Sequence, residues 1–226
     1  MNVGIIVAGG KSQRMGSDVD KAFLSLGTKP VLAYSVDAYE RCQDIDSIVL
    51  VVRKDRLNAA RGMVQMFGFN KVEHVIVGGT QRQASVQNGL DVLDDDVKVV
   101  SVHDGARPCL TPDVISETIK AAKRYGSGVA AVKITDTVKE VQRGVTVSKT
   151  IDRTKLWAVQ TPQTFKIDLL QKAFDNLKKK KTSVTDEAMA VELINKDVRL
   201  VPACLSNIKI TTPDDMRLAG ALLKLN

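Results

Sequence analysis

The segment that decides the fold is an apolar run followed directly by a glycine-rich basic loop. It reads VGIIVAGGKSQRMG over residues 3–16, and Lys21 follows shortly after. A short apolar run that ends at glycines is typical of a buried strand. The glycines let backbone amides approach phosphate oxygens, while Arg14 and Lys21 supply positive charge where a phosphorus–oxygen bond breaks. The segment therefore predicts a triphosphate site at the end of the first strand.

Two common nucleotide motifs do not fit this loop. A P-loop would need glycine at position 5, which is Ile5, and the dinucleotide pattern G-x-G-x-x-G is also absent. A tight turn between strand and helix explains Gly9 and Gly10, but it leaves the basic residues unexplained. The triphosphate interpretation accounts for both.

Further apolar runs and amphipathic segments alternate along the chain. Strand-length runs cover residues 48–52, 72–77, 99–102 and 129–132, and helical periodicity covers 31–42, 57–67, 83–93 and 114–125. The last of these helices is expected to have a capped start at Thr111-Pro112. This alternation predicts an α/β fold, a doubly wound, mostly parallel sheet of Rossmann-like type, with ligands beyond the carboxyl ends of its strands.

The second half of the chain departs from this alternation. Valine-rich stretches around Gln142-Arg143-Gly144 predict a protruding β-hairpin arm at about residues 135–150. Helices at 167–177 and 187–194, strands at 198–201 and 208–210, and a capped helix from Thr212-Pro213 are expected to complete the chain. We expect one domain over residues 1–226.

Composition narrows the classes of function. The chain has a net charge of +7 and three widely spaced cysteines, which indicate an anionic partner and neither a disulfide framework nor a zinc site. The densest basic run, residues 178–181, has no interleaved aromatics and is interpreted as a solvated helix end, so we expect no nucleic-acid partner. No leader or membrane span is apparent, and we expect a cytoplasmic protein without membrane contact.

Two later blocks carry polar groups to predicted strand ends. In one, Gly79, Thr80 and Ser85 could hydrogen-bond a pyrimidine edge, although a capped turn with Ser85 inside the next helix fits equally well. In the other, Asp104 could hold Mg²⁺ or a substrate hydroxyl and Arg107 a phosphate, although a local ion pair explains either residue alone. The adjacent His103 is interpreted as structural, because an ionised phosphate nucleophile needs little deprotonation.

With the first loop, these blocks and QTPQTF at residues 160–165 resemble the 2-C-methyl-D-erythritol 4-phosphate cytidylyltransferase family over nearly the whole chain. The resemblance implies CTP and a polyol phosphate as substrates, Mg²⁺ as cofactor and a homodimer formed through the hairpin arm. It implies nucleotide-binding roles for Ala8, Gly9, Gly10, Lys11, Ser12, Gln13, Met15, Gly79, Thr80, Ser85, Asp104 and Ala106. Asp104 is a candidate metal ligand, the alternative being Mg²⁺ held by the CTP phosphates.

The same resemblance implies catalytic roles and a place for the acceptor. Catalytic roles fall to Arg14, Lys21, Arg153 and Lys209, of which the last two would hold the acceptor phosphate. Acceptor-binding roles fall to Arg107, Thr137, Thr161 and Thr185, and Thr137 near the base of the arm would reach the neighbouring subunit's site. From the residues alone, Thr185-Asp186-Glu187 is equally a helix start, and Lys209 is equally an exposed strand residue.

The chain departs from the family pattern in its first loop, and two rival functions remain. Ser12 stands where relatives usually have glycine, which puts the backbone path of the loop in doubt, and Gly9 stands where they often have alanine. Transfer to ribitol 5-phosphate is the sibling activity, but residues 104–107 and 152–157 fit the erythritol branch better. A basic RNA-binding protein would leave Arg14, Lys21 and the acceptor residues unexplained.

Overall fold

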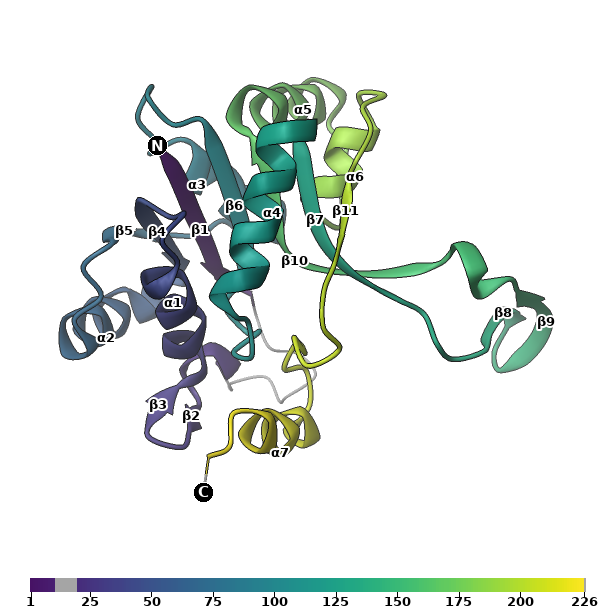
Figure 1. The fold of residues 1–226 in the computed structure, drawn as a ribbon, viewed down its shortest axis with the longest axis horizontal. Coiled ribbons are helices and arrows are strands. Elements are labelled where there is room, and N and C mark those ends of the chain that lie inside the picture. The colour runs from purple at the N-terminus through teal and green to yellow at the C-terminus, as the bar shows by residue number, and fades with distance from the viewer. Residues whose placement is uncertain (11–19, 226) are drawn as a thin grey trace.

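The structure, a computed structural model, describes residues 1–10 and 20–225 and is built on one seven-stranded sheet (Figure 1). The strands run in the order β11-β7-β10-β6-β1-β4-β5. Their bounds are β1 Asn2–Ala8, β4 Ser47–Val52, β5 Val72–Val77, β6 Val99–Asp104, β7 Ser127–Lys133, β10 Trp157–Lys166 and β11 Leu200–Pro202. Neighbouring strands are parallel except β10, which runs antiparallel to β6 and β7. The predicted α/β fold with a mostly parallel sheet is confirmed.

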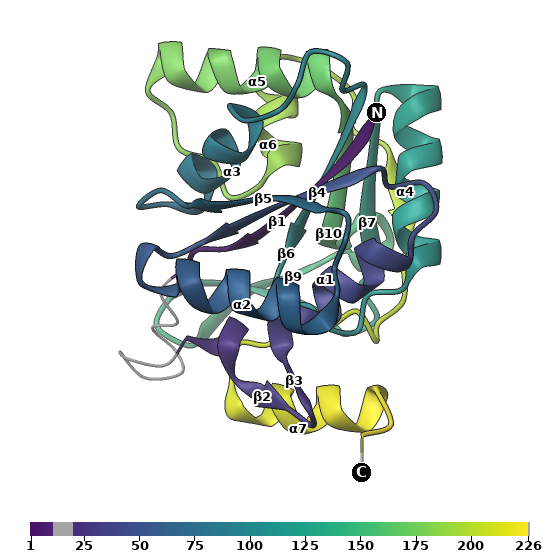
Figure 2. The same ribbon diagram turned by 90° about the vertical axis from the view of Figure 1, so that its left-hand side faces the viewer.

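Helices cover both faces of this sheet (Figure 2). One face packs against α1 (Val31–Arg41), α2 (Leu57–Phe67) and α4 (Pro112–Tyr125), and the other against α3 (Arg82–Leu90), α5 (Ile167–Lys180) and α6 (Glu187–Glu192). Side chains alternate along β1, so that Ile6 packs on the α1 face and Ile5 on the α3 face. Each such fully buried aliphatic side chain stabilises the fold by about 1.5–3 kcal/mol.

The structure corrects two local predictions and adds one strand that the sequence does not predict. Residues 208–210 form no strand, since Ile210 is attached by one backbone hydrogen bond, from its amide to the Ala106 carbonyl at 2.8 Å. Pro112 is the first residue of α4, but the Thr111 side chain makes no capping hydrogen bond. The sequence also gave no sign that residues 157–166 form β10, the antiparallel strand inserted between β6 and β7.

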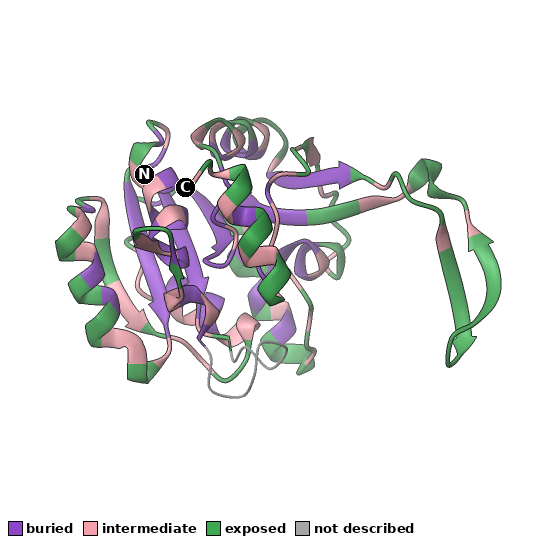
Figure 3. Cartoon of the chain, turned by 90° about the horizontal axis from the view of Figure 1, so that it is seen from below, coloured by how far each residue is buried: buried purple, intermediate pink, exposed green. Residues whose placement is uncertain are grey.

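The predicted hairpin arm is present and projects away from the sheet (Figure 1). It consists of β8 (Val138–Arg143) and β9 (Thr146–Ile151), and Gly144 between them has a φ of 58°, which favours glycine. A short 3₁₀ turn, η4 (Arg153–Lys155), connects β9 to β10. The arm is almost entirely exposed (Figure 3).

A smaller apolar cluster lies at the end of the sheet where β1 and β6 finish. The C-terminal helix α7 (Pro213–Leu222) packs near the small strands β2 (Ser25–Leu26) and β3 (Lys29–Pro30), with Leu26, Ile210 and Ala219 buried between them (Figure 2). A capping box between Thr212 and Asp215 starts α7, as predicted. Within the part of the chain that the structure describes, no helix is long and apolar enough to cross a membrane.

Candidate active site

A pocket lies at the carboxyl ends of β1 and β6, the edge where the sequence predicts a ligand site. It combines the end of β1, the turn η2 (Lys21–Phe23) and the end of β6 with two basic residues, Arg82 at the start of α3 and Lys209 from the C-terminal part of the chain. Its lining residues are Val7, Ala8, Gly10, Asp20, Lys21, Ala22, Arg82, Asp104, Ala106 and Lys209. Six of the predicted site residues therefore share one pocket: Ala8, Gly10, Lys21, Asp104, Ala106 and Lys209.

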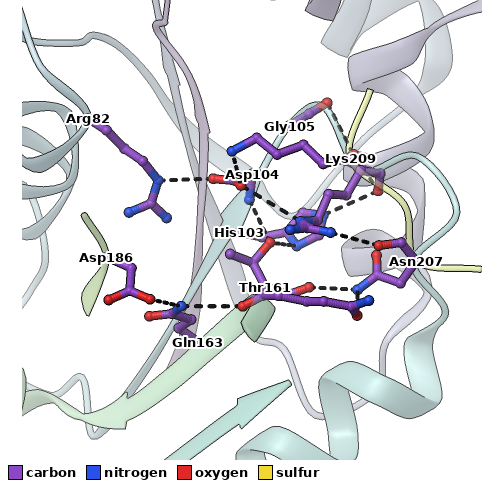
Figure 4. Close-up of polar contacts among 12 residues, drawn as sticks. Arg82, His103, Asp104, Gly105, Thr161, Gln163, Asp186, Asn207 and Lys209 are labelled. Atoms are coloured by element: carbon purple, nitrogen blue, oxygen red, sulfur yellow. Dashed lines mark hydrogen bonds and ion pairs between the residues drawn. The ribbon is translucent and has the colours of Figure 1, made fainter. Parts of the chain in front are cut away.

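Asp104 is the carboxylate with which the cationic side chains of this pocket pair (Figure 4). Its Oδ1 accepts a hydrogen bond from Arg82 Nε at 3.0 Å, and its Oδ2 lies 2.7 Å from Lys209 Nζ and 3.7 Å from Arg107 Nε. Burial alone would raise the pKa of Asp104, but attraction to these three cations outweighs it and holds the pKa well below its usual range. The carboxylate is therefore ionised, and it orients three cations around the pocket.

His103, next to Asp104, is a structural residue. It is fully buried, and burial lowers its pKa to about 3, so the ring is neutral near pH 7. The Thr161 hydroxyl lies 2.9 Å from His103 Nδ1 and also accepts a hydrogen bond from the Asp104 backbone amide at 3.1 Å. Thr161, predicted to face the acceptor, fixes the backbone of Asp104 in this structure.

The two predicted nucleotide loops lie in contact. The Ser85 hydroxyl accepts a hydrogen bond from the Gly79 amide at 3.1 Å and donates one to the Gln81 carbonyl at 3.1 Å. A Cβ added to Gly9 would lie 3.2 Å from Ser85 Oγ, which places the loop after β1 beside the loop after β5. Ser85 is buried inside α3, as the capped-turn alternative predicts, and its hydroxyl holds the preceding loop, while Thr80 is exposed. Contact of these residues with a pyrimidine stays a prediction.

Hydrogen bonds, and not strand pairing, fasten the segment that carries Lys209. Arg107 donates to the Asn207 carbonyl at 2.7 Å, and the Asn207 side chain donates to Gln160 Oε1 and to the Thr161 carbonyl at 2.9 and 2.8 Å (Figure 4). Arg107, predicted to bind the acceptor, thus holds the neighbouring segment and Asp104. Lys209 itself is 38% exposed, so its ammonium group is open to the pocket.

Thr185 lies at the start of α6, where the sequence equally predicts a helix start. Asp186 is the N-cap residue, and its Oδ1 accepts a hydrogen bond from the Met189 amide at 2.9 Å. Its Oδ2 accepts another from Gln163 Nε2 at 3.0 Å (Figure 4). Thr185 is exposed, and its role toward an acceptor stays a prediction.

Other predicted residues lie away from the pocket or outside the described residues. Arg153 is exposed in η4 beside the arm, where its guanidinium donates to the Thr135 carbonyl, and Thr137 is exposed just before β8. A single chain therefore does not place Arg153 with Lys209 in the pocket. Five predicted residues, Lys11, Ser12, Gln13, Arg14 and Met15, belong to residues 11–19, outside the described part.

Sequence reasoning missed Arg82 and Glu187 as members of the site. Arg82 donates through its two terminal nitrogens to the two Glu187 carboxylate oxygens at 2.6 and 2.9 Å while its Nε reaches Asp104. Burial works against the charged guanidinium, but attraction to Glu187 and Asp104 raises its pKa above the usual value. The position of Arg82, directly after a predicted strand-end loop, is a signal that could have placed it at the site. Its pairing with Glu187 has no local signal, because the two residues are 105 positions apart.

The described residues do not form a metal centre by themselves. Among them, no group of three or more His, Cys, Asp or Glu side chains is placed to hold a cation. Both oxygens of Asp104, the predicted metal ligand, already face cationic side chains. The role of Asp104 as a metal ligand stays a prediction.

The whole chain matches one family of known proteins. A model of the 2-C-methyl-D-erythritol 4-phosphate cytidylyltransferase family (IspD) matches residues 2–225. Proteins of that name from Alkaliphilus oremlandii and Dehalococcoides mccartyi are 39% and 44% identical, covering 97% of this chain in each case and 94% and 95% of theirs.

Solved structures agree with this match. The 4-diphosphocytidyl-2C-methyl-D-erythritol synthase of Anaerococcus prevotii superposes with a TM-score of 0.86 at 31% identity, over 99% of this chain and 96% of that one. The cytidylyltransferase of Thermus thermophilus gives 0.81 at 28%, over 98% of each chain. With the nucleotide loops, the charged pocket and the arm all within the matched residues, the chain belongs to the 2-C-methyl-D-erythritol 4-phosphate cytidylyltransferase family.

Proposed function

We propose that this protein transfers CMP from CTP to 2-C-methyl-D-erythritol 4-phosphate and releases pyrophosphate, in non-mevalonate isoprenoid precursor synthesis. The observation that carries the proposal is the pocket itself. In a chain that matches the family from residue 2 to 225, it joins Lys21 and Gly10 of the nucleotide loop region to Lys209 of the predicted acceptor side. We expect the enzyme to work in the cytoplasm.

The proposed chemistry is an in-line displacement at the α-phosphorus of CTP. A phosphate oxygen of the acceptor forms the new bond to the α-phosphorus, and the bond to the bridging oxygen of the leaving pyrophosphate breaks. The acceptor phosphate is already ionised, so no general base is needed. Lys21 and Arg14 would stabilise the charge on the phosphates, and Lys209 would hold the acceptor against the repulsion between the two polyanions.

Magnesium has a place in this proposal as a companion of the nucleotide. Because Asp104 is surrounded by three cations, we propose that Mg²⁺ arrives with CTP and is held mainly by phosphate oxygens. When bound there, it would neutralise the charge that accumulates on pyrophosphate. Asp104 would mainly orient Arg82 and Lys209.

Arg153 and Thr137 acquire a role if two copies pair through the arm. Both lie beside the exposed hairpin, and the bond from Arg153 to the Thr135 carbonyl places them on the same part of the arm. Three valines on the hairpin, Val141, Val145 and Val147, are 49%, 95% and 53% exposed, which favours burial against a second copy. We propose a homodimer in which each arm brings Arg153 and Thr137 to the other copy's pocket.

Pyrophosphate release tests the proposal. The protein is incubated with Mg²⁺, each of the four NTPs in turn, and either methylerythritol phosphate or ribitol 5-phosphate. We expect release only with CTP, methylerythritol phosphate and the metal together. Equal release with ribitol 5-phosphate would favour the sibling activity, and absence of release with every pair would favour a binding protein.

A further inference from the structure

Arg82 joins two buried carboxylates that come from distant parts of the chain. Its Nε donates a hydrogen bond to Asp104 at 3.0 Å, and its two terminal nitrogens donate to the two carboxylate oxygens of Glu187. The Glu187 side chain is 1% exposed and the Asp104 side chain 11%. A buried carboxylate is tolerated only where it is paired, so the burial of Glu187 depends on this guanidinium.

The three residues belong to three parts of the site. Arg82 is the first residue of α3, directly after the loop that holds Gly79. Asp104 ends β6 inside the pocket, and Glu187 is the first residue of α6, directly after the exposed Thr185 and the N-cap Asp186. Arg82 therefore links the nucleotide loop, the pocket carboxylate and the start of α6. The next residue of α3, Gln83, also holds the segment before α6, since it accepts from the Val184 amide at 3.1 Å and donates to the Thr182 carbonyl at 3.4 Å.

The start of α6 has a second attachment on its other side. Gln163 of β10 donates to Asp186 at 3.0 Å and accepts from the Ala188 amide at 2.9 Å. Figure 4 shows Arg82 pairing with Asp104 and, apart from this pair, Gln163 pairing with Asp186. Gln163 secures the backbone of α6, while Arg82 ties its first side chain to the nucleotide loop.

The arrangement needs arginine and not only a positive charge. Three donors of one planar guanidinium serve two carboxylates at once, and two of these bonds form a parallel pair with Glu187. We call this set of three bonds the fork. A lysine ammonium is a point charge on a flexible stem, and it cannot form the same set of bonds.

We propose that Arg82 is a positioning residue that couples the nucleotide loop to the acceptor side of the pocket by holding the start of α6 in place. The proposal rests on the transfer reaction proposed above. Loss of the fork would release the Glu187 side chain, while Gln83 and Gln163 still hold the backbone on either side of Thr185. The start of α6 would then be less precisely placed, so that the acceptor binds less tightly or at a less productive angle. The CTP site would keep Lys21 and its glycine loops.

Two variants test this: Arg82→Lys, which keeps the charge but loses the fork, and Glu187→Gln, which keeps the shape but loses the carboxylate. We expect each to lower kcat/KM for the acceptor by about tenfold or more, since a displacement of about 1 Å costs up to ~10²-fold. CTP affinity measured by calorimetry should stay near that of wild type. The double variant should be little worse than the worse single one, because both changes break one contact.

Amide hydrogen exchange gives a readout that does not need activity. Arg82→Lys should speed exchange in residues 186–192 and leave α5 unchanged. The matched control is Arg41→Lys, whose guanidinium pairs with Asp37 at 3.1 Å on the surface of α1. It should change neither exchange nor kinetics.

Several results would overturn the inference. Wild-type kinetics in folded Arg82→Lys and Glu187→Gln would do so, and so would a loss of CTP affinity as large as the loss toward the acceptor, which would make Arg82 a nucleotide ligand. Unchanged exchange in α6 would also contradict it. An inactive wild type whose α6 still loosens in Arg82→Lys would instead refute the proposed function and leave the positioning role supported.

Discussion

Lys209 Nζ lies 2.7 Å from Asp104 Oδ2, although the two residues come from opposite halves of the chain. The pair lines the same pocket as Lys21, so a cation on the predicted acceptor side shares the pocket with a cation of the predicted triphosphate site. The strand-end carboxylate thus holds Lys209 and Arg82 at the pocket by ion pairing. Substrates would then enter between groups that are already oriented.

The first prediction concerns Lys209. Replacing it with Ala removes the cation proposed to hold the acceptor phosphate, while Asp104 keeps Arg82 and Arg107 as partners. We expect a KM for methylerythritol phosphate at least about tenfold higher, and a CTP affinity close to wild type by calorimetry. A variant that loses both affinities equally would place Lys209 in the nucleotide site.

Lys21 is predicted to act at the transition state. Lys21→Ala should lower kcat by about 10² or more, the scale for removing one preorganised donor of positive charge. Stability should change little, because Lys21 is only partly buried. Lys178→Ala, in the exposed basic end of α5, is the control and should leave kcat unchanged. A folded Lys21→Ala enzyme with normal kcat would show that the charge is stabilised elsewhere.

The loop after β5 is predicted to require glycine at position 79. A Cβ there would lie 2.4 Å from the Ala84 Cβ, closer than two carbon atoms pack, so Gly79→Ala must displace the loop. We expect weaker CTP binding and unchanged acceptor binding. Gly62→Ala in α2 is the matched control: its Cβ meets nothing within 4 Å, and it should stabilise the protein by about 0.5–1 kcal/mol. Normal CTP binding by Gly79→Ala would remove this loop from the nucleotide site.

Buried His103 gives the protein a predictable pH dependence. Its pKa falls from 6.5 to about 3 on folding, so below pH 6.5 the unfolded chain binds a proton that the folded chain does not. The free energy of unfolding should therefore decrease as pH falls from about 6.5 toward 3, by up to ~1.4 kcal/mol per pH unit from this group.

Urea denaturation of wild type and His103→Gln at pH 7, 6 and 5 measures this contribution. The variant should be less stable at pH 7 and should show a flatter loss between pH 6.5 and 5. Asp104 acts at lower pH, because its depressed pKa contributes stability that is lost only as pH falls below its usual value of 3.8. Equal slopes for the two proteins would mean that the pKa of His103 does not change on folding.

The sequence predicts those parts of the fold whose signal is local. Runs of apolar residues mark β1, β4, β5, β6 and β7, although β5 and β6 also contain polar residues. β10 carries Gln163 and Thr164 in its buried part, and their polar groups are satisfied by Asp186, Ser101 and Thr118. Such partners lie far away in the sequence, so a polar buried strand has no local pattern.

The residues of the site also divide into those that the local sequence predicts and those that it does not. Gly79 and Lys21 are found by their loops, and Asp104 by its place at a strand end. Arg82 gains its role only from Asp104 and Glu187, which the fold brings to it from other elements. Residues 208–210 were wrongly predicted as a strand because isoleucines at alternate positions imitate one, whereas Ile210 is buried in the cluster beneath α7.

The last prediction separates an arm that serves its own pocket from one that serves a second copy. Arg153 lies beside the arm and Lys209 in the pocket, so the two residues can be inactivated in different chains. Lys209→Ala chains keep a working arm, and Arg153→Ala chains keep a working pocket. In a mixed dimer with exchanged arms, one of the two sites combines both working parts. Purified mixed dimers should therefore recover about half of the wild-type kcat/KM for the acceptor, measured at acceptor concentrations below KM. The control pairs a chain that carries both changes with a wild-type chain. This dimer has no complete site when the arms are exchanged, and it has one complete site when they are not. Recovery in the control and none in the first mixture would show that each arm serves its own chain.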